Sequence, residues 1–107
     1  MTIKELLKLD IKSESIKKVD SFLASTIRNS EEYFRAISFK STILHNIGKT
    51  NDALKLLYSF IPFFTDLDSN GIILILKIKN HMHSYAPKLW KTYSLMVFHS
   101  SKKTLHS

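Results

Sequence analysis

Apolar side chains in the first half of the chain recur at intervals of three and four residues, which is the spacing of one face of an α-helix. This pattern predicts a helix over residues 13–27, with Ser13 as its N-cap. A shorter helix is predicted before it, ending near Leu9 and opened by Thr2 and Glu5, which are spaced as a capping box. The apolar face of the longer helix consists of Ile16, Val19, Phe22, Leu23 and Ile27.

Residues 30–47 carry two apolar stripes and therefore predict a helix that packs on two sides. Asn29 and Glu32 are spaced as a second capping box at its start. Gly48 is expected to end the helix in the left-handed conformation, which glycine adopts without steric penalty. The first stripe holds Phe34, Ile37, Ser41 and Leu44, and the second holds Ala36, Phe39, Ile43 and Ile47.

Another helix is predicted to follow directly, with Thr50 or Asn51 as its cap and with Pro62 ending or kinking it. A connection this short forces the two helices to pack antiparallel as a hairpin. The buried face of the second helix is expected to hold Ala53, Leu54, Leu57, Tyr58 and Ile61.

Beyond this hairpin, residues 66–71 are predicted to form a turn. The segment Ile72–Ile78 has the length of a strand or a buried helix, and a helix is favoured because no second strand pattern exists to pair with it. Pro87 should end the preceding element, and one more short helix is expected over about residues 89–98. Because the chain has only 2 Gly and 2 Pro, the predicted fold class is all-α, with stacked antiparallel hairpins as in an α-solenoid fragment or a small helical bundle.

Gly48 and Ala53 stand five residues apart between two sets of bulky apolar positions. In this arrangement the stretch from Arg35 to Ile61 resembles a tetratricopeptide repeat, an antiparallel helix pair with Gly in its turn and Ala early in its second helix. The bulky positions are matched by Ile37, Leu44, Ile47, Leu57 and Ile61. The chain departs from the family pattern at Lys40, Phe60 and the early Pro62, and it holds no second copy of the Gly and Ala.

The resemblance implies a protein–protein interaction module in which the inner face of the first repeat helix contacts a peptide or partner protein. The residues on that face are Arg35, Ser38, Thr42 and His45. They are polar and mildly cationic, so an acidic or polar peptide would suit them. A single repeat leaves its apolar faces open, so flanking helices or a partner must cover them.

Charge divides the chain near Asp68. Residues 1–68 hold 10 Lys and Arg against 9 Asp and Glu, whereas residues 69–107 hold 6 Lys and no acid. The sequence therefore predicts a charge-balanced helical body over residues 1–68 and a basic C-terminal segment over residues 69–107, either a capping helix or a partly disordered tail.

The basic segment has three interpretations, which the sequence leaves open. Its cations and aromatic side chains would suit phosphate contact and base stacking, and the candidate nucleic-acid residues are Lys77, Lys79, Lys88, Trp90 and Lys91. It has no Arg, however, and carries no known nucleic-acid recognition motif, so a solvated tail is the second interpretation. The third is that the segment is the truncated or altered end of a longer repeat protein.

Motifs for catalysis and metal binding are incomplete. The segment 66–73 is similar to the first half of an EF-hand calcium loop, but the position that requires a bidentate Glu holds Lys77. His81 and His83 would point about 200° apart on a helix, so they are not expected to share a metal ion. His45 has no acid or nucleophile predicted to face it. We therefore expect no catalytic residues, no metal and no cofactor.

The sequence thus predicts a non-enzymatic protein–protein interaction module, with a nucleic-acid-binding accessory protein as the alternative. No membrane span is expected, because the longest aliphatic run is Ile72–Leu76. A cytoplasmic location is expected, in agreement with a chain that has no Cys. Formation of a homo-oligomer stays open.

Overall fold

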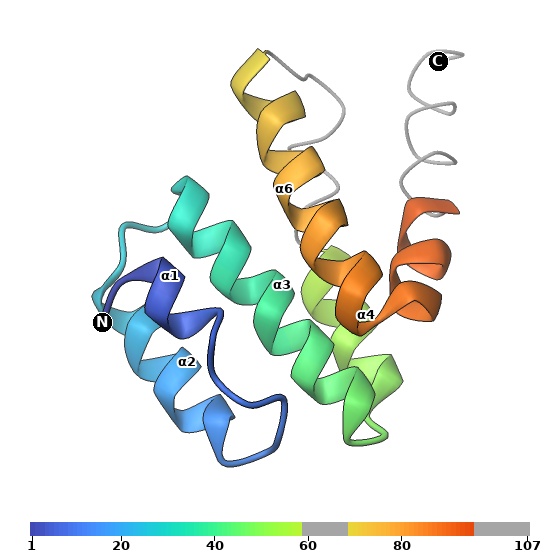
Figure 1. The fold of residues 1–107 in the computed structure, drawn as a ribbon, viewed down its shortest axis with the longest axis horizontal. Coiled ribbons are helices and arrows are strands. Elements are labelled where there is room, and N and C mark those ends of the chain that lie inside the picture. Colours follow the sequence, from blue (N-terminus) through green and yellow to red (C-terminus); the bar gives the residue numbers. More distant parts are fainter. Residues whose placement is uncertain (59–68, 96–107) are drawn as a thin grey trace.

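The computed structural model of the chain describes residues 1–58 and 69–95 (Figure 1). All regular secondary structure within these two ranges is α-helical, which confirms the predicted all-α fold class. The helices are α1 (Ile3–Leu6), α2 (Ser15–Ser25), α3 (Glu31–Asn46), α4 (Thr50–Tyr58), α6 (Ser69–Tyr85) and a helix over residues 87–95. The predictions for Ile61, Pro62, residues 66–68 and residues 96–98 lie outside the described residues.

The capping box predicted at the N-terminus is formed. The backbone N–H of Glu5 donates to Thr2 Oγ1 at 3.2 Å, and the backbone N–H of Thr2 donates to Glu5 Oε1 at 3.4 Å. The reciprocal bonds satisfy two N–H groups that a helix start otherwise leaves open. The helix that they open ends at Leu6, earlier than the predicted end near Leu9.

The predicted cap at Ser13 is wrong. Helix α2 begins two residues later, and its N-cap, Glu14, makes no side-chain capping bond. Ser15 instead turns its hydroxyl back to donate to the carbonyl of Asp10 at 2.6 Å. At the other end α2 stops at Ser25, so Ile27 lies outside the helix and is 80% exposed, in contrast to the predicted buried position.

The cap of α3 is Ser30, which accepts from the backbone N–H of Tyr33 at 3.2 Å. The predicted capping box of Asn29 and Glu32 is therefore wrong. Asn29 has a φ of 65°, in the left-handed region that asparagine tolerates better than most residues, and it turns the chain between α2 and α3. The predicted span of α3 itself is confirmed within one residue at each end.

Gly48 ends α3 as predicted, with a φ of +91°. Its N–H donates to the carbonyl of His45, and the next N–H, of Lys49, donates to the carbonyl of Leu44 at 2.8 Å. This pair of bonds is the Schellman motif, which satisfies carbonyls at the end of a helix. The chain then enters α4 at Thr50, so Thr50 is the first helical residue instead of the cap.

The two stripes of α3 enter two separate core clusters. Ala36, Phe39 and Ile43 pack with Leu6 and Val19 on the side of α1 and α2. The other stripe packs on the side of α4 and the C-terminal helices in a larger cluster of Phe34, Ile37, Leu44, Ala53, Leu57, Ile78, Met82, Ala86, Leu89 and Tyr93. Ile47 is 36% exposed because it lies at the C-cap. Helix α3 is therefore the central element of the fold, as its two stripes predict.

The segment 72–78 is helical, as favoured, and residues 69–71 belong to the first turn of the same helix instead of a separate turn. Helix α6 ends at Tyr85, and Pro87 is the first residue of the next helix, where a missing N–H carries no penalty. Ala86, which joins the two helices, is buried together with Leu89 and Tyr93. The basic C-terminal segment thus shares a core with the charge-balanced N-terminal body, up to residue 95.

Helix α6 lies beside α3 and runs in the same direction (Figure 1). Lys77 Nζ, from the middle of α6, donates to Glu31 Oε1 at the start of α3, at 2.5 Å. Near the ends of both helices, Asn46 Nδ2 donates to the carbonyl of Tyr85 at 3.4 Å. Figure 1 shows α4 and the 87–95 helix returning in the opposite direction, so residues 31–58 and 69–95 form two antiparallel hairpins whose first helices are parallel.

Candidate binding site in the C-terminal hairpin

The structure does not bring Arg35, Ser38, Thr42 and His45 together as an open face. Ser38 is 2% exposed and Thr42 is fully buried, and their hydroxyls donate to the carbonyls of Arg35 and Ser38, one helical turn earlier. Arg35 and His45 are half-buried and lie about 15 Å apart along the helix axis. This face is covered because α6 packs against α3. That tertiary contact could not be predicted from the sequence pattern of α3 alone.

His45 also has a local partner. Its Nδ1 forms a hydrogen bond with Thr50 Oγ1 at 3.1 Å, across the turn between α3 and α4. This bond ties the imidazole to the hairpin connection. The accessible part of the predicted partner-binding face is thus reduced to portions of two separate side chains.

A different set of residues, with cations beside apolar and aromatic side chains, gathers in the C-terminal hairpin, which consists of α6 and the 87–95 helix. These residues line a hollow with a volume of about 590 Å³, here called the basic hollow, and they are Lys79, His83, Pro87, Trp90, Lys91 and Ser94. Lys79 and His83 stand one turn apart on α6, and the other four follow a single face of the 87–95 helix. Each helix therefore contributes one stripe to the hollow.

On each helix the stripe next to the basic hollow is buried in the core, and the stripe that lines the hollow is left facing solvent. Met82 on α6 and Ala86, Leu89 and Tyr93 beyond it are all at most 2% exposed and belong to the larger core cluster. Each buried stripe is held in the core and so fixes the rotation of its helix about the helix axis, which determines where the hollow-lining stripe points. The core packing of the hairpin thus positions the candidate site.

The positive charge of the basic hollow is not balanced by any acidic residue of the same C-terminal segment. Lys79, His83 and Lys91 are exposed, and residues 69–107 contain no Asp or Glu. Lys88 is also exposed on the 87–95 helix, next to the hollow. Lys77 differs, because it is bound to Glu31 of α3. Of the five lysine and tryptophan positions predicted for nucleic acid, Lys79, Trp90 and Lys91 therefore line the hollow, Lys88 flanks it and Lys77 is paired.

Trp90 supplies the aromatic surface of the basic hollow. The indole is half-buried, packs against the larger core cluster, and has its ring centroid 5.7 Å from that of Tyr93 at an interplanar angle of 60°. Tyr93 is fully buried, and this burial raises the pKa of its phenol. A ring backed in this way is held in place, so its free part presents an aromatic surface with few accessible orientations.

His83, which the sequence suggested only as a metal ligand, lines this site. The signal that could have found it is the spacing of four residues from Lys79, which puts both on one face of a helix. His81 faces another way. Its ring lies against Phe39 of α3 and Tyr85, and burial, followed by the positive charge of Arg35, lowers its pKa.

Metal ligands do not converge in the part of the chain that the structure describes. No group of three His, Asp or Glu side chains in it is placed to hold a metal ion. Lys77, at the position where a calcium loop would need a Glu, donates to Glu31, and residues 69–71 are helical. The ligand positions Asp66 and Asp68 lie outside the described residues.

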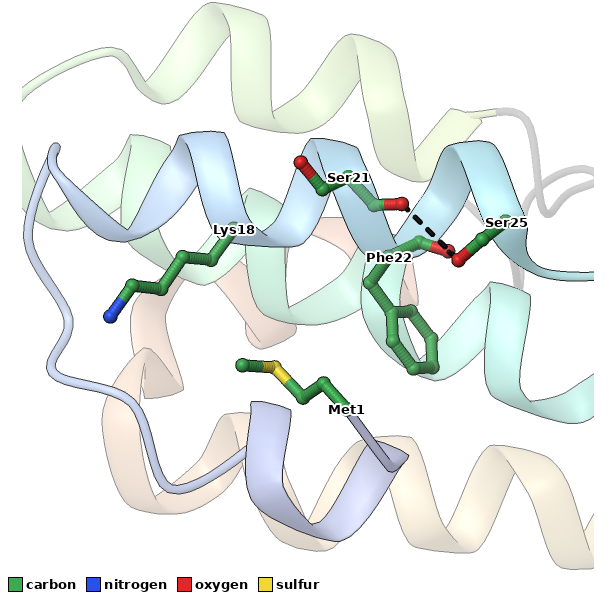
Figure 2. Close-up of a pocket in the computed structure, with 5 residues that line it drawn as sticks. All are labelled: Met1, Lys18, Ser21, Phe22 and Ser25. Atoms are coloured by element: carbon green, nitrogen blue, oxygen red, sulfur yellow. Dashed lines mark hydrogen bonds between the residues drawn. The ribbon is translucent and has the colours of Figure 1, made fainter.

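A second hollow, of about 250 Å³, lies between the N-terminal residue and α2 (Figure 2). It is lined by Met1, Lys18, Ser21, Phe22 and Ser25. The hydroxyl of Ser25 already donates to the carbonyls of Ser21 and Phe22. Figure 2 shows the amino group of Lys18 well apart from the Phe22 ring. With one lysine and a serine satisfied by its own helix, this hollow offers less to a charged ligand than the basic hollow does.

Compared with known proteins, the chain matches no family model, no curated protein and no solved structure. The resemblance to the tetratricopeptide repeat therefore stays a prediction. Among the residues described, no helix combines the length and the apolar character that crossing a membrane requires.

Proposed function

We propose that this chain is a non-enzymatic cytoplasmic interaction module of helical-repeat type, which holds a polyanionic macromolecule in the basic hollow. The arrangement of two hairpins with parallel first helices supports the repeat-like part of the proposal, because solenoid repeats stack helix pairs in this manner. The burial of Ser38 and Thr42 moves the proposed site from the inner face of α3 to the C-terminal hairpin.

One observation carries the proposal: Lys79 and Lys91 line the same hollow from different helices, with Trp90 in the same lining. A negatively charged partner placed there meets cations from both helices. A single exposed ion pair contributes only about 0–1 kcal/mol, so binding depends on several contacts made together and on the aromatic surface. Moderate affinity that weakens with added salt is the expected behaviour.

Trp90 makes the proposal directly testable, because it is the only Trp of the chain. Its fluorescence can be followed while a poly-glutamate peptide or a single-stranded oligonucleotide is added at low ionic strength. Either polyanion should change the emission in a saturable way. The double substitution Lys79→Ala and Lys91→Ala should weaken that binding strongly.

The matched control removes the same amount of charge elsewhere, through Lys8→Ala and Lys17→Ala at exposed positions of the N-terminal part. This control variant should bind nearly as well as the unmodified protein. Equal loss in both double variants would mean that net charge, and not the basic hollow, drives binding. Absence of binding by both polyanions would overturn the proposal.

A further inference from the structure

We infer that the ligand of the basic hollow is single-stranded nucleic acid, with a base stacked on Trp90 and backbone phosphates on Lys79 and Lys91. The inference rests on the proposed function and names the class of polyanion. It depends on three features of the hollow, which are its aromatic surface, its concave shape and the layout of its cations.

The aromatic surface favours nucleic acid over an acidic peptide. The carboxylates of an acidic peptide are bound by cations, and they have no flat π-system to stack on the large half-buried indole. A nucleotide offers a phosphate and a flat π-system together, and stacking on an aromatic side chain is a main source of affinity for single strands. Because Trp90 is backed by Tyr93, the indole loses little conformational freedom when a base stacks on it.

The shape favours a single strand over a duplex. The cations line a hollow between two helices, whereas a duplex is bound by elements that project into its grooves. Bases in a duplex are stacked on one another and cannot reach Trp90. The volume of about 590 Å³ falls within the range of about 300–1,000 Å³ that small-molecule pockets occupy, which is enough for one nucleotide unit while its neighbours lie outside.

The number of cations at the site determines how strongly binding should depend on salt concentration. Lys79 and Lys91 line the hollow, and the exposed Lys88 neighbours Lys91 on the helix surface and can extend the phosphate track. Two or three phosphate contacts on a single strand predict a slope of log K against log salt of about −1.4 to −2.1. Binding should then weaken by about 7- to 20-fold when salt rises fourfold. Because the residues lining the hollow include no Arg to read base edges bidentately, little sequence preference is expected.

The first experiment uses the unmodified protein. A thymidine oligonucleotide of about ten residues, within the usual site size, is compared with an abasic strand of equal length, a duplex of the same length and a poly-glutamate peptide. The oligonucleotide should quench Trp90 and bind at least about fivefold more tightly than each of the other three probes. An abasic strand that binds and quenches as well as the oligonucleotide would overturn base stacking.

The second experiment separates the effect of the aromatic ring of Trp90 from the effect of its size. Trp90→Phe keeps an aromatic face and Trp90→Leu keeps an apolar side chain, and circular dichroism checks that both variants remain helical. Anisotropy of a labelled oligonucleotide should show weakening of about fivefold or more for Trp90→Leu and a smaller loss for Trp90→Phe. Equal affinities of the two variants would contradict the inference. Tight binding of poly-glutamate without binding of the oligonucleotide would overturn it while leaving the proposed function intact, and binding of neither probe would overturn both.

Discussion

The imidazole of His81 lies against the ring of Phe39, with the two ring centroids 5.5 Å apart, where α6 packs on α3. The ring of Tyr85, also on α6, has its centroid 4.9 Å from that of the imidazole. The Nε2 atom is buried and has no hydrogen-bond partner among the described residues, and Arg35 of α3 opposes a second positive charge there. The neutral imidazole is therefore the form that this interface accommodates.

This environment predicts that the protein loses stability in mild acid. Burial, and then Arg35, hold the pKa of His81 below its usual value, so on acidification the unfolded chain binds the proton first. The contribution of His81 is complete above about pH 6.5, the unfolded-state pKa, and is lost as the pH falls below it. Urea unfolding at about pH 7.5 and about pH 5 should show a lower midpoint in acid.

The variant His81→Leu should reduce this loss, because it removes the titrating group from the interface. His83→Leu is the matched control, since His83 is exposed two residues away and its removal should leave the loss unchanged. If both variants lose as much stability in acid as the unmodified protein, His81 is not the source.

Two serines test the helix caps: Ser30, the observed N-cap of α3, and Ser13, which the sequence suggested as the N-cap of α2. Ser30→Ala removes the hydroxyl that accepts from Tyr33 and should lower the free energy of unfolding by about 1 kcal/mol. Ser13→Ala should have almost no effect, because Glu14 occupies the N-cap position of α2. Chemical denaturation of the two variants measures both values, and the reverse order would contradict the assignment of these caps.

Gly48 should be sensitive to substitution for a conformational reason. A Cβ added there meets nothing within 4 Å, so sterics with neighbours play no part, but the φ of +91° is unfavourable for other L-residues. Gly48→Ala should destabilise the protein by about 1–2 kcal/mol. Gly48→Asn should lose less, because asparagine visits the left-handed region more readily. Equal losses in thermal or urea unfolding would argue against backbone strain as the cause.

Ala53 lies where α4 packs in the larger core cluster and is fully buried. Ala53→Leu should destabilise the protein by about 1–3 kcal/mol, because a close-packed contact cannot take the larger side chain without shifts. Ala24, which is exposed on α2, provides the control. Ala24→Leu should change the free energy of unfolding by less than about 0.5 kcal/mol. A neutral result for Ala53→Leu would show that the contact between α3 and α4 has room to relax.

Local pattern was enough to predict much of the helical framework. The spacing of Phe34, Ile37, Ala36, Phe39 and Ile43 determines which sides of α3 are apolar, and each side enters its own core cluster. The turn at Gly48 also follows from local chemistry. Helix starts were harder, because several capping residues stand close together and a shift of one or two residues decides among them, as at Asn29 and Ser30.

The candidate site could be predicted only in part, because it depends on how distant segments pair. The sequence identified Lys79, Trp90 and Lys91 as residues of one basic segment, but their convergence requires the turn at Ala86 to fold the 87–95 helix back along α6. The burial of Ser38 and Thr42 depends likewise on α6 packing against α3. A helical period reports which side of a helix is apolar, and carries no information on which polar positions another helix will cover.

The last prediction concerns how much the basic C-terminal segment contributes to the stability of the fold. Leu89 is 2% exposed in the cluster that holds Ala53 and Leu57 of α4, so Leu89→Ala should lower the free energy of unfolding of the whole chain by about 2–5 kcal/mol. Leu95, on the same helix, is 61% exposed, and Leu95→Ala should cost less than about 0.5 kcal/mol. Urea unfolding followed by circular dichroism measures both, because helix content reports on every element at once. A small effect of Leu89→Ala, or a separate early transition confined to part of the helical signal, would mean that the C-terminal hairpin unfolds independently of α3 and α4. A single transition, shifted to a lower urea concentration, would instead mean that the C-terminal hairpin unfolds together with α3 and α4.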